Sequence, residues 1–138
     1  MDNVSPLRIK EAEPGDILEV GRALLAPGGF HMTLGEGDRV ALNQNPTVHG
    51  VRPAIDVTMA SVVHRYEAAT MGVILTGMGR DGTHGSTLIH AAGGKVIAED
   101  ESTCVVWGMP RSVAEAGVAD AIVPLQEVPR AIERLLGK

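Results

Sequence analysis

The sequence is poor in cysteine and aromatic residues, and it has no long apolar run. Its single cysteine, Cys104, excludes an internal disulfide and a zinc site built from several cysteines, and it fits a reducing compartment such as the cytoplasm. Phe30, Tyr66 and Trp107 are too few aromatic residues to stack a single-stranded nucleic acid. No apolar run approaches the roughly 20 residues of a membrane span, and the first residues show no basic-then-apolar export signal.

Acidic residues outnumber basic ones, 17 against 12, so the formal net charge is -5 at neutral pH. A field of this sign repels nucleic acids and anionic membranes, and we expect neither nucleic-acid binding nor membrane insertion. With 138 residues and 44% apolar content, the chain has the size of one domain and enough apolar residues for a hydrophobic core.

Strand and helix patterns alternate through residues 51–138. The expected helices lie at about 54–68, 83–92, 110–116 and 128–136, and the expected strands at 73–76, 95–98 and 121–123. Continuous apolar strands separated by helices are typical of parallel strands covered on both faces. The sequence therefore predicts an α/β fold with a parallel sheet.

The segment 17–50 has short apolar stretches separated by glycine-rich turns. Residues 30–34 and 39–42 flank the turn Gly35-Glu36-Gly37-Asp38, which predicts a β-hairpin inserted ahead of the parallel strands. Charge, proline and glycine in residues 1–16 indicate a connector or an edge element. Within one domain, we expect a connector or edge at 1–16, a hairpin region at 17–50 and a parallel α/β core at 51–138.

Four stretches carry a family resemblance. They are LAPGGFHM at Leu25–Met32, RPAID at Arg52–Asp56, GVILTGMGRDG at Gly72–Gly82 and CVVWGMPR at Cys104–Arg111. Together, and in this order, they resemble the CheB family of chemotaxis protein-glutamate methylesterases. The resemblance implies a serine hydrolase on a doubly wound, Rossmann-like parallel sheet, which removes methyl groups from glutamate methyl esters on chemoreceptors. It implies no cofactor; the partners would be methylated chemoreceptors and, in a longer protein, a receiver domain.

The same resemblance assigns site residues. The acid of the family's Ser-His-Asp triad lies in its LTGMGxDG loop, which carries over to Asp81. Its carboxylate would accept the Nδ1 hydrogen of the catalytic histidine and stabilise the imidazolium. Open parallel sheets place their sites beyond the carboxyl ends of strands, where Asp81 is expected. Met78 matches a residue that lines the family's site, and we assign Met78 and Gly79 to the pocket.

The sequence also departs from the family pattern. The family's nucleophile lies in a Gly-x-Ser-x-Gly-Gly turn and its histidine in a His-Met-Pro stretch, and neither motif occurs here. The resemblance thus covers the C-terminal part of the catalytic domain without its N-terminal strands. Loss of a triad nucleophile costs on the order of 10^6 in turnover, so we expect the chain alone to be inactive. An uncovered strand edge would also promote self-association.

Other interpretations of the Asp81 loop remain open. Asp81 has the position of an N-cap for a helix that begins near Gly82 or Thr83. The loop is also a Gly-x-Gly-x-x-Gly between a strand and a helix, with Glu99 and Asp100 where a dinucleotide-binding domain carries its ribose-binding acid. Against this second interpretation, the Asp81 carboxylate would repel the phosphates. A non-catalytic binding or regulatory module of the same fold is a further alternative.

Remaining chemistry-bearing residues favour structural roles. Ser86 and His90 would share a helix face, but a serine inside a helix lacks free amides for an oxyanion. The five histidines show no spacing typical of a closed metal site, and we predict no metal. Cys104 lies among apolar residues, which favours a small buried side chain over a nucleophile. Trp107 and Met109 would either wall the pocket or pack in the interior.

Overall fold

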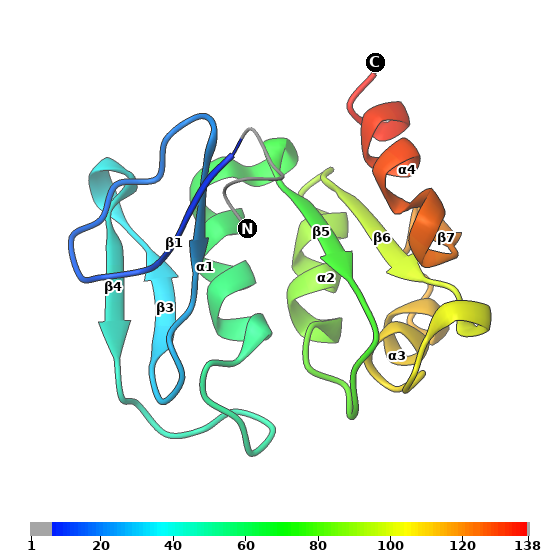
Figure 1. Cartoon of the computed structure of the whole chain (residues 1–138), viewed down its shortest axis with the longest axis horizontal. Coiled ribbons are helices and arrows are strands. Elements are labelled where there is room, and N and C mark those ends of the chain that lie inside the picture. The colour runs from blue at the N-terminus through cyan, green and yellow to red at the C-terminus, as the bar shows by residue number, and fades with distance from the viewer. Residues whose placement is uncertain (1–6, 138) are drawn as a thin grey trace.

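The computed structural model describes residues 7–137 (Figure 1). Its strands are β1 (Arg8–Glu11), β2 (Arg22–Leu25), β3 (His31–Leu34), β4 (Val40–Asn43), β5 (Met71–Ile74), β6 (Lys95–Glu99) and β7 (Ala121–Val123). Its helices are α1 (Ile55–Tyr66), α2 (Thr83–Ala91), α3 (Met109–Glu115) and α4 (Val128–Leu135). Within the described residues, no helix combines the length and the apolar character needed to cross a membrane.

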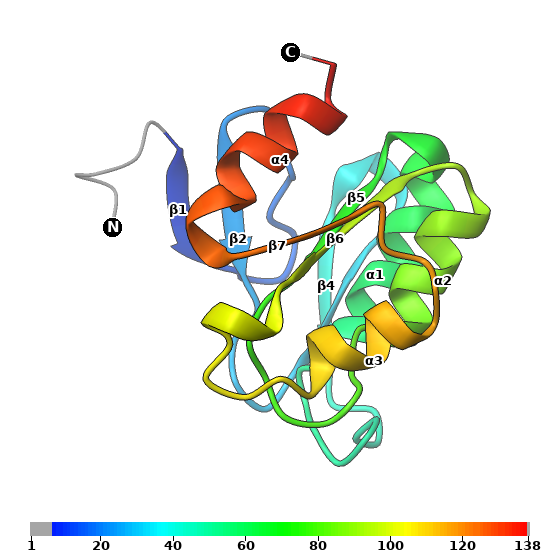
Figure 2. The same cartoon turned by 90° about the vertical axis from the view of Figure 1, so that its right-hand side faces the viewer.

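The main sheet consists of β5, β6 and β7, all parallel, with β6 in the centre. Helices α2 and α3 cover one face of this sheet, and α4 covers the other (Figure 2). The predicted α/β fold, with parallel strands covered on both faces, is confirmed.

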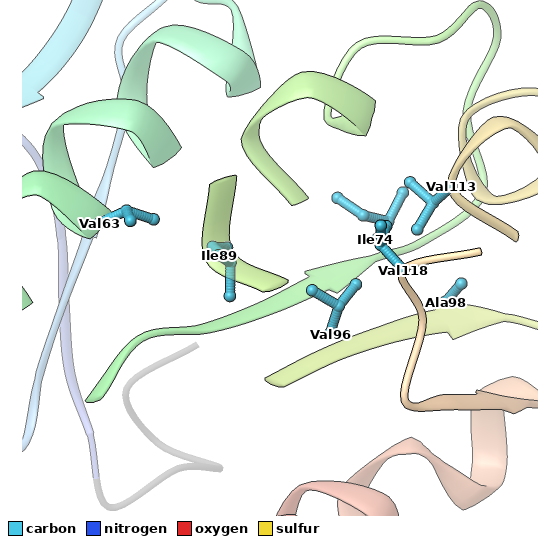
Figure 3. Close-up of a cluster of buried hydrophobic side chains, with 7 residues drawn as sticks. All are labelled: Val63, Ile74, Ile89, Val96, Ala98, Val113 and Val118. Carbon is cyan, nitrogen blue, oxygen red and sulfur yellow. The ribbon is translucent and has the colours of Figure 1, made fainter. Parts of the chain in front are cut away.

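The pleat of β6 explains why both faces are apolar, because successive side chains of a strand point to opposite sides. Val96 and Ala98 belong to the cluster packed by α2 and α3, whereas Ile97 packs with Ala131 of α4. The first cluster, drawn in Figure 3, comprises Val63, Ile74, Ile89, Val96, Ala98, Val113 and Val118. A strand buried on both faces thus forms the centre of the fold.

The expected hairpin is formed by β3 and β4, which pair in antiparallel register. Strand β2 also lies in the hairpin region 17–50, but it pairs in parallel with β1 rather than with β3. A second apolar cluster, built on Ala12, Leu34 and Val40, joins these strands to α1. Helix α1 packs against both β3 and α2, so it connects the hairpin to the parallel sheet (Figure 1).

Core packing gives a first prediction. Ile89 of α2 is fully buried, so we expect Ile89→Ala to lower the free energy of unfolding by about 2–5 kcal/mol, through lost burial and a residual cavity. Ile122 of β7 is 49% exposed, and the matched variant Ile122→Ala should cost only about 0.5 kcal/mol. Chemical denaturation measures both values. Equal effects of the two variants would contradict this description of the core.

The outer edge of β5 gives a second prediction. Among residues 7–137, no strand pairs with this edge. Large apolar side chains are also exposed elsewhere: Leu25 of β2 is 54% exposed, and Leu75, which follows β5, is 40% exposed. Unpaired edges and exposed apolar surface favour association. We expect a dimer or larger species in sedimentation at tens of micromolar. A monomer with one cooperative thermal transition and no binding of an apolar dye would contradict this expectation.

Candidate active site

Asp81 lies in the turn between the carboxyl end of β5 and the start of α2. The amide of Thr83 donates to the carbonyl of Arg80 at 3.2 Å, which closes this turn. Gly82 has a φ of +99°, and a Cβ there would come within 2.8 Å of the Ile74 side chain, so the position requires glycine. The local geometry places Asp81 where open parallel sheets carry their functional groups.

The carboxylate of Asp81 is fixed by the first turn of α1. Its Oδ2 accepts from the amide of Ile55 at 2.7 Å, and its Oδ1 accepts from the amide of Asp56 at 3.0 Å. Asp81 is only 7% exposed. The N-cap residue of α1, Ala54, has no side-chain acceptor of its own, so Asp81 satisfies amides that α1 would otherwise leave unpaired. The alternative in which Asp81 caps the helix near Gly82 is therefore wrong, because Asp81 caps α1 instead.

The cap of α2 comes from Asp56. Its Oδ1 accepts from the amides of Gly82 and Gly85 at 2.9 and 2.8 Å, and Asp56 is 5% exposed. Each carboxylate thus binds amides of the segment that carries the other. We call these four hydrogen bonds, from Ile55, Asp56, Gly82 and Gly85, the Asp56–Asp81 clamp.

His49 adds a third side chain to the clamp. Its Nε2 lies 2.9 Å from Oδ2 of Asp56. The ring is held by a two-residue turn in which Val48 and Val51 exchange backbone hydrogen bonds of 3.1 and 3.0 Å. His49 and Gly50, the central residues, have φ values of +54° and +76°, as a type I′ turn requires. The sequence did not point to His49 or Asp56 as site residues.

Potential ligand atoms of His49, Asp56 and Asp81 all lie within 4.8 Å of one another. All four carboxylate oxygens, however, already accept hydrogen bonds from protein donors. The four amides and the His49 ring already balance much of the charge of these two carboxylates, so a cation would gain less here than at carboxylates without such donors. The absence of a metal therefore stays our prediction.

The stretch 104–111 packs against the Asp81 loop. The carbonyl of Gly77 accepts from the amides of Gly108 and Met109 at 3.1 and 2.8 Å. A Cβ at Gly108 would come within 2.7 Å of this carbonyl, so glycine permits the close approach. On the same loop the Met78 side chain is 82% exposed and Gly79 has a φ of +86°. Their assignment to the pocket remains a prediction.

Neither Ser86 nor Cys104 has the surroundings that a catalytic nucleophile needs. Ser86 is fully buried whereas His90 is exposed, and no hydrogen bond joins them in the described part of the chain. Burial raises the pKa of the Cys104 thiol, and the neighbouring Glu99 carboxylate raises it further. Because the thiolate is the nucleophilic form, the raised pKa disfavours Cys104 as a nucleophile, although its side chain is half-buried rather than fully buried as expected.

Dinucleotide binding finds little support in this geometry. The amides of Gly82 and Gly85, to which a diphosphate would bind, are occupied by the carboxylate of Asp56. Glu99 is 1% exposed and accepts from the Thr76 amide and the Thr103 hydroxyl, each at 2.8 Å. Neither the phosphate position nor this acid is free for a nucleotide.

The family model for the CheB methylesterase matches residues 1–132. The chain belongs to the CheB methylesterase family. A crystal structure of the Thermotoga maritima CheB methylesterase catalytic domain superposes with a TM-score of 0.91 and 43% identity, over 97% of this chain and 72% of that chain.

Curated relatives are longer than this chain. The protein-glutamate methylesterase/protein-glutamine glutaminase of Symbiobacterium thermophilum is 49% identical over all of this chain, which covers 38% of the relative. The protein of the same name from Pyrococcus abyssi is 45% identical over 99% of this chain and 39% of its own length. The chain therefore spans less than half of the length of these relatives. The family resemblance inferred from the four sequence stretches is confirmed by the family model and by these identities.

The occupied amides of α2 give a third prediction. Calorimetry should detect no binding of NAD or NADP at millimolar ligand, because diphosphate would have to displace the buried Asp56 carboxylate and its negative charge. Binding with micromolar affinity would contradict the expectation. A well-characterised dinucleotide-binding dehydrogenase, measured in the same buffer, serves as the positive control.

Proposed function

We propose that this chain contributes the acid of a Ser-His-Asp triad, Asp81, to a protein-glutamate methylesterase that acts on chemoreceptors. The observation that carries the proposal is the fixed position of the Asp81 carboxylate at the carboxyl end of β5, held by the amides of Ile55 and Asp56. The names of the relatives support the reaction class, because they describe hydrolysis at a modified glutamate side chain.

In the proposed reaction, a serine oxygen attacks the ester carbonyl while a histidine takes the serine proton. The bond to methoxide then breaks, and the histidine returns the proton so that methanol leaves. Water attacks the acyl-serine in the same way, which releases the glutamate carboxylate and restores the serine. Asp81 would accept the Nδ1 hydrogen of the histidine in both halves of this cycle, which keeps the ring in the correct tautomer. No cofactor takes part in these steps.

The geometry of Asp81 suits this role. Each carboxylate oxygen carries two lone pairs, so both oxygens can accept a further hydrogen bond beyond the amide that each already binds. The positive end of the α1 dipole also stabilises the negative charge. Asp81 is nearly buried, and an electrostatic interaction with an imidazolium is stronger there than in water.

The same arrangement would also serve a second reaction. The relatives' names combine methylesterase with protein-glutamine glutaminase activity. An ester and a primary amide of the glutamate side chain pass through the same acyl-serine, and the leaving group is methanol in one case and ammonia in the other. We therefore include glutamine deamidation in the proposal.

The serine and the histidine would come from polypeptide outside this chain, since neither family motif occurs in its sequence. In this proposal, residues 1–138 are a partial catalytic domain with a connector or edge segment at 1–16, a hairpin region at 17–50 and a parallel α/β core at 51–138. Its substrates would be methylated chemoreceptors in the cytoplasm, and a receiver domain would regulate the longer protein. Met78 and Gly79 would line the substrate pocket.

A chimera tests the proposal. The chain replaces the matched 72% of the Thermotoga maritima catalytic domain, and hydrolysis of methylated chemoreceptor is measured. We expect activity that a covalent serine inhibitor blocks. In the chimera, Asp81→Asn should lower turnover by about 10^4, because an asparagine favours the wrong tautomer of the histidine. The 138-residue chain alone should show no measurable hydrolysis.

The matched control is Asp120→Asn, because Asp120 also binds a backbone amide, that of Val96, at 2.8 Å, but lies outside the Asp81 loop. This variant should retain most of the activity of the chimera. Full activity of Asp81→Asn would remove Asp81 from the triad. Serine-dependent turnover by the chain alone would contradict the proposed division of the triad.

A further inference from the structure

We propose that Asp56 is a positioning residue for Asp81, which it holds through the clamp without touching the substrate. The inference rests on the proposed function, because positioning of Asp81 matters for catalysis only if Asp81 is the triad acid. Asp56 acts through two different groups. Its backbone amide binds the carboxylate of Asp81, and its side chain binds the amide of Gly82, the residue that follows Asp81.

This double contact joins two segments that are 25 residues apart in sequence. Movement of the Asp81 loop together with the first turn of α2 away from α1 would break the bonds of the Asp56 side chain to Gly82 and Gly85 and also those of the Asp81 side chain to α1. Movement of the first turn of α1 would break the same four bonds. The loop and the helix end are therefore expected to open together.

Charge balance explains how two nearly buried carboxylates can lie so close. Like charges in a shared site repel each other, and such a pair is tolerated only where donors compensate. Five donors face the pair: the four amides of the clamp and the ring of His49. Arg80 and His84 add further basic groups in the shallow groove of about 320 Å³ that His49 and Asp56 also line. The N-termini of α1 and α2 add further positive potential at the two carboxylates.

The consequence for the reaction is geometric. A triad histidine is oriented by its acid, and a displacement of about 1 Å can cost about 10²-fold in rate. Asp81 binds an amide through each of its two oxygens, so the orientation of its carboxylate depends on where the first turn of α1 lies. Asp56 fixes that turn against the Asp81 loop. His49 in turn holds the second carboxylate oxygen of Asp56, with 2.9 Å between Nε2 of His49 and Oδ2 of Asp56.

Native-state hydrogen exchange of the 138-residue chain tests this inference. We expect Asp56→Ala to accelerate amide exchange about 10- to 100-fold at Gly82 and Gly85, because charge-assisted hydrogen bonds are lost. The decisive amide is that of Ile55, which binds Asp81 and not Asp56. It should accelerate by a similar factor. An unchanged Ile55 amide would show that Asp56 caps α2 only, and it would overturn the inference.

Two variants separate positioning from a general loss of stability. Asp56→Asn keeps an oxygen that can accept from Gly82 and Gly85, and it should restore slow exchange at these glycines and at Ile55. Asp120→Ala removes the carboxylate that binds Val96, and it should accelerate the Val96 amide while Ile55 and Gly82 stay slow. Acceleration of the clamp amides by Asp120→Ala, or no rescue by Asp56→Asn, would contradict the inference.

If Asp56→Ala does not fold, the native chain still decides the question. In low denaturant, Ile55, Asp56, Gly82 and Gly85 should exchange through one opening with the same free energy and the same denaturant dependence. Separate openings for the α1 and α2 amides would overturn the inference. No turnover is measured, so this result is independent of whether the chimera depends on Asp81.

Discussion

Two carboxylates, Asp56 and Asp81, cap each other's segments and thereby join the start of α1 to the turn between β5 and α2. Asp81 follows β5 and binds amides of α1, and Asp56 lies in α1 and binds amides at the start of α2. Neither helix provides a capping side chain at its own N-cap residue, which is Ala54 for α1 and Gly82 for α2. Without this exchange, both helix ends would carry buried amides with no partner, which is costly.

The parallel sheet determines where this exchange can occur. Because β5, β6 and β7 run in the same direction, the loops that follow β5 and β6 meet at one edge of the sheet. The loop after β6 packs on the loop after β5 through Gly77 and Gly108, and Glu99 at the end of β6 binds the Thr76 amide. The Asp81 loop is thus fixed by α1 on one side and by residues 99–109 on the other.

The sequence predicted the existence and order of the parallel strands and their helices, because these elements depend on local apolar patterns. The bounds of β5 were wrong: the strand was expected at 73–76 but lies at Met71–Ile74. Strand β6 carries a continuous apolar run, and α1 has apolar residues at three- and four-residue spacing. The pairing of β1 with β2 was not predicted, since a short polar strand such as Arg8–Glu11 has no apolar pattern and its partner decides its state. Asp81 itself was found through a family motif, not through a periodicity.

The clamp was missed for a related reason. Asp56 and Asp81 lie 25 residues apart, and His49 reaches Asp56 from a turn, so no local spacing connects the three. One signal was available: α1 begins after Ala54, which cannot cap, and amides at a helix start need an acceptor from elsewhere when no local one exists. An uncapped helix start thus predicts a tertiary acceptor, although sequence alone does not say which carboxylate provides it.

The clamp also explains how a glycine-rich loop with the spacing of a phosphate-binding loop can occur in a member of the CheB methylesterase family. In both cases glycines let a chain turn from a strand into a helix whose first amides face an anion. In dinucleotide-binding proteins that anion is the ligand, whereas here it is Asp56 of the same chain. An internal carboxylate needs no ligand to stay in place, so the hydrogen bonds that hold the start of α2 do not depend on a bound molecule. The role proposed for Asp81, that of a triad acid, would require such a preorganised position, because a triad acid holds a histidine still while charge develops on the ring.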